Sequence, residues 1–161
     1  MKLYMQKDTF RWGVPMPLKD RSGRTRYTVT SDAYALGKRL HVTDLAGREA
    51  VYIHQAIPSL FPRYQVEVYG RPVTEVVKDL SYFRPRYTIE ELGWEVLGSL
   101  GSQDYEITQH STVVASCRPQ QNQAGEDVLA LEFYDRSTDL AALGVILAIN
   151  CVLAPQESKR P

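Results

Sequence analysis

DLAALGVILAINCVL, Asp139 to Leu153, is the stretch that decides the fold of this chain. It is apolar on every face of a helix, with Asn150 as its one clearly polar position. Such a helix is either fully buried or lies in a membrane. A helix of about fifteen residues is roughly 22 Å long, whereas a membrane-spanning helix needs about 20 residues. We therefore expect a core helix over 139–153, with an N-cap among Ser137, Thr138 and Asp139, and an end before Pro155.

The rest of the chain has the pattern of short strands separated by turn residues. In residues 128–134, for example, Leu129, Leu131 and Phe133 alternate with other residues and so share one face. The other expected strands lie near residues 3–5, 16–18, 24–30, 38–45, 51–53, 64–68, 73–78, 87–89, 94–97, 105–107 and 112–115. About a dozen evenly spaced short strands are typical of a barrel or sandwich.

The strands and the helix together indicate one architecture. An eight-stranded barrel is filled by side chains alone, whereas a barrel of about eleven strands has room for a central helix. A helix satisfies its own backbone hydrogen bonds and can lie in a dry interior. We expect a mainly β fold, a closed barrel of about twelve strands around the buried C-terminal helix. The alternative, a helix on one side of an open sheet, would leave half its apolar surface in water. Residues 1–154 would form the single domain, and residues 155–161 a polar tail.

Composition excludes several classes of protein. The chain has 161 residues, 43% of them hydrophobic, and a formal net charge of +0. A dedicated nucleic-acid binder usually carries a strong basic excess, so no nucleic-acid partner is expected. Cys117 and Cys151 form no CxxC motif, and we expect them to be free, buried thiols in a reducing compartment. The first residues form no signal peptide, which predicts a cytoplasmic protein.

The sequence shows no catalytic constellation. His41, His54 and His110 fall on different predicted strands, with no carboxylate or second ligand at a recognisable spacing. No serine lies in a nucleophile-elbow sequence. We therefore expect no enzyme activity, no metal site and no cofactor.

Basic residues are the candidate binding site. They are Lys38, Arg39, Arg63, Arg71, Lys78, Arg84 and Arg86. Arginine forks suit phosphate oxygens, and the aromatic and basic segment 82–86 suits a membrane interface. Arg63 and Arg86 alternate with Tyr64 and Tyr87, so they point outward if the tyrosines point inward. Two interpretations stay open: a shared basic surface for an anionic ligand, and a solvated exterior balanced by nearby glutamates and aspartates.

Several segments, in order along nearly the whole chain, resemble the LURP-one-related family. They are Met1–Lys7 with Trp12-Gly13, Leu36–Val42, the pairs Arg63-Tyr64 and Arg86-Tyr87, Leu92–Val96, and Leu143–Val152. The chain looks like a small bacterial-type, single-domain member. The resemblance implies the fold of the Tubby C-terminal domain and the phospholipid scramblases, a twelve-stranded barrel around a hydrophobic helix.

The same resemblance implies a function. It suggests a non-catalytic, monomeric binding module for anionic, phosphoinositide-like headgroups, peripheral at the inner face of the membrane. The alternative is a protein-interaction or structural module without a small-molecule ligand. The lipid-binding basic residues of Tubby domains do not align with positions in this chain, so none is carried over.

Overall fold

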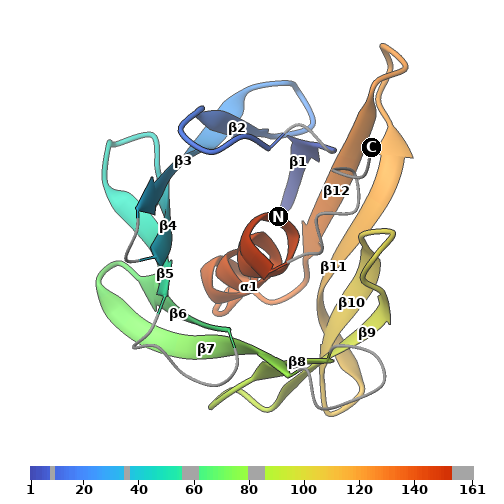
Figure 1. The fold of residues 1–161 in the computed structure, drawn as a ribbon. Coiled ribbons are helices and arrows are strands. Elements are labelled where there is room, and N and C mark those ends of the chain that lie inside the picture. Colours follow the sequence, from blue (N-terminus) through green and yellow to red (C-terminus); the bar gives the residue numbers. More distant parts are fainter. Residues whose placement is uncertain (8–9, 35–36, 56–61, 80–85, 154–161) are drawn as a thin grey trace, which may run out of the picture.

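Twelve antiparallel strands close into a barrel around one helix (Figure 1). The computed structural model describes residues 1–7, 10–34, 37–55, 62–79 and 86–153. Each strand pairs with its neighbours in the chain, and β1 closes the ring against β12. The strands are β1 (Lys2–Gln6), β2 (Met16–Lys19), β3 (Thr25–Tyr34), β4 (Gly37–Thr43), β5 (Glu49–Gln55), β6 (Arg63–Val68), β7 (Arg71–Asp79), β8 (Arg86–Ile89), β9 (Trp94–Ser99), β10 (Asp104–Gln109), β11 (Thr112–Gln121) and β12 (Asp127–Phe133). The predicted architecture is confirmed.

The apolar stretch forms the predicted central helix. It runs as α1 (Asp139–Leu147) and continues in π-helical geometry as η1 (Ala148–Leu153). Thr138 occupies the predicted N-cap position, but no side chain caps the helix, and the Thr138 hydroxyl donates instead to the carbonyl oxygen of Asp135 (3.4 Å). Pro155 lies outside the described residues. No helix in the described ranges is both long and apolar enough to cross a membrane.

The core lies between the helix and the inner faces of the strands. All residues of α1 from Ala141 to Leu147 are buried, because strands surround the helix on every side. Asn150, the polar position in the stretch, bonds to two side chains of the barrel wall. It accepts a hydrogen bond from the Tyr105 hydroxyl (2.9 Å) and donates to Cys117 Sγ (3.5 Å).

Two neighbouring strand pairs are joined more weakly than the others. Among the described residues, a single residue pair, Tyr4 with Lys19, joins β1 to β2. A single pair, Ile89 with Trp94, joins β8 to β9. Every other pair of neighbouring strands shares at least four residue pairs. We call these two places the seams of the barrel.

The barrel has two distinct ends. One end contains the last residues of β3 and β7, the first residues of β4 and β6, and Leu153 at the end of the helix. We call this end the C-terminal mouth. The opposite end holds the tight turns at 20–24, 44–48 and 69–70 and the beginning of α1. Since the strands alternate in direction, the position of a residue along its strand decides which end it occupies.

Candidate functional site

Lys78 and Tyr87 hold the end of the helix at the C-terminal mouth. Lys78 shares the inward face of β7 with buried Thr74 and Val76. Its ammonium donates to the Leu153 carbonyl oxygen (2.9 Å), and the Tyr87 hydroxyl donates to the same oxygen (3.2 Å). The last carbonyls of a helix lack partners within the helix, and a cation is favourable there. Burial lowers the pKa of Lys78 and raises that of Tyr87 to about 12.

A second lysine reaches the same mouth from β4. Lys38 alternates in phase with buried Leu40, and its Nζ lies 5.4 Å from the centre of the Trp12 ring. Trp12 packs edge-to-face against Phe10, with ring centres 5.2 Å apart. The Gly13 amide donates to the buried Ser31 hydroxyl (2.9 Å), which ties this segment to β3. A lysine over an aromatic face makes a cation–π contact. This contact holds the Lys38 ammonium at the mouth, where it is available to an anionic ligand.

Arg63 belongs instead to the outer wall of the barrel. It alternates with buried Tyr64 and points outward, as the strand phase predicted. Its Nη1 lies 2.5 Å from Glu75 and 3.1 Å from Glu90. The hydrogen bond to Glu75 is the main cause that raises the pKa of Arg63. For this residue, the interpretation of a balanced exterior is confirmed.

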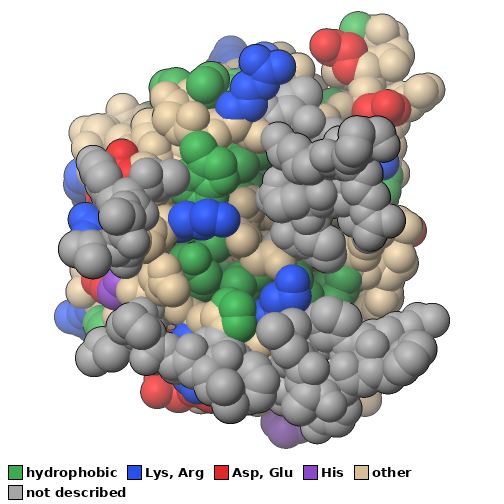
Figure 2. Space-filling view, viewed as in Figure 1, with side chains coloured by type: hydrophobic (Ala, Val, Ile, Leu, Met, Phe, Trp, Pro, Cys, Tyr) green, Lys and Arg blue, Asp and Glu red, His purple; other side chains and the backbone are tan. Residues whose placement is uncertain are grey.

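Arg39 and Arg71, whose placement is described, do not point into the mouth with the two lysines. Arg71 begins β7 and therefore lies at the opposite end from Lys78. Seven residues of strand separate the two by roughly 23 Å. Arg39 is exposed on the outer face of β4. Arg84 and the side chain of Arg86 lie outside the described residues. Figure 2 shows, among the described residues of the viewed face, Lys and Arg side chains separated by hydrophobic ones.

The outer wall of β4 and β5 carries a stack of three rings that sequence analysis missed. Tyr52 stacks between His41 (4.9 Å) and His54 (4.6 Å). Carboxylates hold both histidines: His41 contacts Glu49 (2.5 Å) and Asp32 (3.3 Å), and His54 contacts Glu67 (2.7 Å). These contacts cross between strands, so they leave no recognisable spacing in the sequence. Within the described ranges, no three potential ligands are placed to hold a metal ion.

The two cysteines lie in the barrel interior, as predicted, and both are free and buried. Burial raises the pKa of Cys117 to about 11 and that of Cys151 to about 12. A thiolate is the reactive form of cysteine. In this environment neither thiol is prepared for nucleophilic chemistry.

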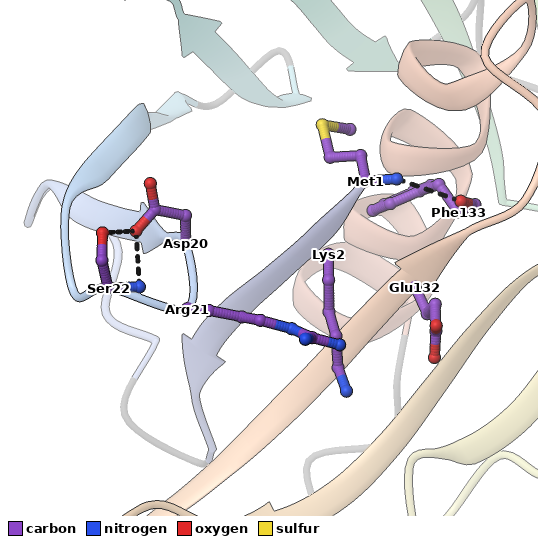
Figure 3. A pocket seen from close by; sticks show the side chains of 7 residues that line it. All are labelled: Met1, Lys2, Asp20, Arg21, Ser22, Glu132 and Phe133. Atoms are coloured by element: carbon purple, nitrogen blue, oxygen red, sulfur yellow. Dashed lines mark hydrogen bonds between the residues drawn. The ribbon is translucent and has the colours of Figure 1, made fainter.

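A hollow of about 500 Å³ lies at the opposite end of the barrel (Figure 3). Its lining residues are Met1, Lys2, Asp20, Arg21, Ser22, Glu132 and Phe133. Sequence analysis proposed none of them as a binding residue. The available signal was the turn Asp20-Arg-Ser-Gly-Arg24, which places Arg21 at the tip of a tight hairpin between β2 and β3.

Comparison with known proteins gives three findings. Residues 1–150 match the family described as LURP-one-related. The protein YxjI of Bacillus subtilis (strain 168), which carries no assigned function, is 30% identical over 113 residues, 70% of either chain. A solved structure of a protein from Arabidopsis thaliana has a TM-score of 0.60 at 14% identity, and the match covers 91% of this chain and 88% of that one. This last likeness shows the shared fold.

Proposed function

This chain belongs to the LURP-one-related family, and on that premise we propose that it is a non-catalytic module that binds the anionic headgroup of a phospholipid at its C-terminal mouth. The observation that carries the proposal is that Lys38 and Lys78 point into the same mouth. Neither lysine forms an ion pair with a described carboxylate, whereas Arg63 forms two. Positive charge is therefore available to a ligand at the mouth, whereas the charge of Arg63 on the outer wall is balanced.

The surroundings of the lysines suit a membrane interface. Phe10 and Trp12 stand beside Lys38, and Tyr87 stands beside Lys78. Aromatic side chains with a polar edge are favoured at the level of lipid headgroups. Among the described residues, the Lys78 ammonium has one acceptor, the Leu153 carbonyl. A phosphate oxygen could share its remaining donors, because an ammonium carries three.

The expected affinity is weak and depends on salt. A basic residue near an anionic surface contributes about 1 kcal/mol, which is about fivefold in affinity. The field decays over about 10 Å at 0.1 M salt. Two lysines alone give brief attachment, so the lipid has to carry several charges for binding to be measurable.

Vesicle co-sedimentation tests the proposal. Phosphatidylcholine vesicles with and without phosphatidylinositol 4-phosphate are mixed with the wild type and with Lys38→Met/Lys78→Met. Arg71→Met is the matched control, because it removes one positive charge from the opposite end. We expect the double variant to bind about 25-fold more weakly, and the control to bind like the wild type. Equal losses in both variants, or no binding of the wild type at low salt, would refute a lipid site at the mouth.

The second candidate is a protein-interaction module without a small-molecule ligand. The pairing of Arg63 with Glu75 and Glu90 favours it, because this pairing removes one of the predicted basic residues from any lipid surface. If the wild type does not bind anionic vesicles at low salt, the protein-interaction module becomes the favoured function.

A further inference from the structure

The hollow at the opposite end of the barrel brings two cations together. Lys2 enters it from β1, and Arg21 enters it from the turn between β2 and β3. Figure 3 shows Arg21 pointing away from its own turn toward Lys2. Among the described residues, neither cation has a carboxylate within ion-pair distance. Within the described part of the chain, the Lys2 ammonium lies over the Tyr4 ring, 5.7 Å from its centre.

The nearest acid on the turn, Asp20, is engaged within the turn and makes no ion pair with Arg21. Asp20 Oδ1 accepts hydrogen bonds from the Ser22 amide (2.9 Å), the Ser22 hydroxyl (2.7 Å) and the Arg24 amide (3.1 Å). Its other oxygen lies 4.0 Å from Arg26. These bonds fix the turn and hold Asp20 on the side away from Lys2 (Figure 3). Arg21 therefore extends from a turn that is fixed by hydrogen bonds, and it has no carboxylate partner among the described residues.

The lining of the hollow defines the ligand by its chemistry. Two convergent cations repel one another, and a group with two negative charges would offset both. An arginine fork fits the oxygens of a phosphate, and a phosphate monoester carries about −1.5 to −2 charges at pH 7. Glu132 on the same wall can accept a hydrogen bond from a ligand hydroxyl, and exposed Met1 offers apolar surface.

We propose that this hollow binds a small phosphomonoester, with the phosphate held between Arg21 and Lys2 and the rest of the ligand against Glu132 and Met1. The site is at the other end of the barrel from the lysines of the C-terminal mouth and is independent of them. The phosphomonoester could be a free metabolite or the headgroup of a lipid. The chemistry that the site recognises is the same in both cases.

Amide NMR titration of the full chain at pH 7.5 tests the site. The probes are inorganic phosphate and glycerol 3-phosphate, with acetate at matched ionic strength as a monoanion. We expect saturable shifts at the amides of Lys2 and Ser22 with both phosphates, with tighter binding of glycerol 3-phosphate, and no saturable shift with acetate. Vesicles that contain phosphatidic acid form a further arm. If they compete with glycerol 3-phosphate for the site, the ligand includes lipid headgroups; if they do not, it is a free metabolite.

Arg21→Ala and Arg24→Ala form a matched pair, because both residues are exposed in the same turn. We expect Arg21→Ala to weaken phosphate binding about tenfold or more and Arg24→Ala to leave it unchanged. Both variants should keep the melting temperature of the wild type, since the bonds of Asp20 to the turn remain. Absence of saturable shifts in the wild type, or equal losses in both variants, would overturn the proposal. Lys38→Met/Lys78→Met should bind phosphate normally, so the two proposed sites fail or succeed separately.

Discussion

Gly144 lies where α1 passes closest to the barrel wall. A Cβ atom at this position would collide with Val66 and would lie 3.1 Å from Val51 Cγ1. A glycine inside a helix costs about 1 kcal/mol relative to alanine. Because α1 packs so closely on β5 and β6, there is no room for a larger side chain, which explains the glycine at this position despite its cost.

Gly144→Ala should therefore destabilise the protein, although alanine is the better helix former. We expect a loss of about 1–3 kcal/mol in the free energy of unfolding, from overpacking against two β-branched side chains. Gly144→Leu should lose more. Chemical denaturation measures both, and Val66→Ala combined with Gly144→Ala should recover part of the loss. Gly101→Ala is the control, because a Cβ there meets open space. A Gly144→Ala protein as stable as the wild type would contradict the close packing.

Cys117 and Cys151 provide a second prediction at the residue scale. Burial raises the pKa of both thiols, to about 11 and about 12. In the folded protein at pH 8 they should react with a disulfide reagent such as DTNB only as fast as the barrel opens. In denaturant, two thiols per chain should react at once. Rapid labelling of either cysteine under native conditions would show that the interior is accessible.

Three hairpin turns of the barrel share one construction at the scale of the element. They are Asp20-Arg-Ser-Gly-Arg24, Asp44-Leu-Ala-Gly-Arg48 and Asn122-Gln-Ala-Gly-Glu126. In each, the first side chain accepts hydrogen bonds from the amides two and four residues later. The glycine adopts a positive φ of 79–85°, which other residues rarely adopt. Asn122 shows that an amide oxygen performs the same task as a carboxylate.

These turns make stability depend on acid in a defined way. The hydrogen bond from Ser22 is the main cause that lowers the pKa of Asp20, and that from the Arg48 amide the main cause that lowers the pKa of Asp44. A lowered pKa in the folded state gives stability that is present above the unfolded value, 3.8, and is lost as the pH falls through the folded value.

Melting curves of Asp20→Asn/Asp44→Asn between pH 7 and pH 2.5 measure this dependence. The variant should melt close to the wild type at pH 7, because asparagine keeps the acceptor. It should lose less stability than the wild type below about pH 4. Asn122→Asp should change in the opposite direction. Parallel curves for all three proteins would show that these carboxyls do not contribute.

At the scale of the whole molecule, the ring of strands and its filling could be predicted from the sequence. Uniform apolarity over 139–153 predicted the helix, and alternation predicted the strands. The site was harder to predict, because it depends on which end of a strand a residue occupies and on strand register. Lys78 and Arg71 belong to one strand yet lie at opposite ends. Arg63 meets Glu75 only through the pairing of β6 with β7. Neither relation appears as a local pattern.

The seams predict where the barrel opens first. β9 is fully paired with β10 but shares one residue pair with β8. Native-state hydrogen exchange measures this opening. The β9 amides that do not bond to β10 should exchange about tenfold faster than the amides of β11, because β11 is paired on both sides. Equal protection of β9 and β11 would mean that the barrel opens only as a whole.

Closure of β1 on β12 also bears on how a cell makes this protein. Leu3 pairs with Leu131. During synthesis, β1 therefore stays without this partner until β12 has been made. At about 5–20 residues per second, this wait is roughly 6 to 25 seconds. The helix emerges later still, and until it does, the valines of the inner wall have nothing to cover them. A nascent chain in this state is a natural client for a chaperone at the exit tunnel. A ribosome stalled before Asp139 would leave a sheet that is prone to aggregate rather than a shorter working protein.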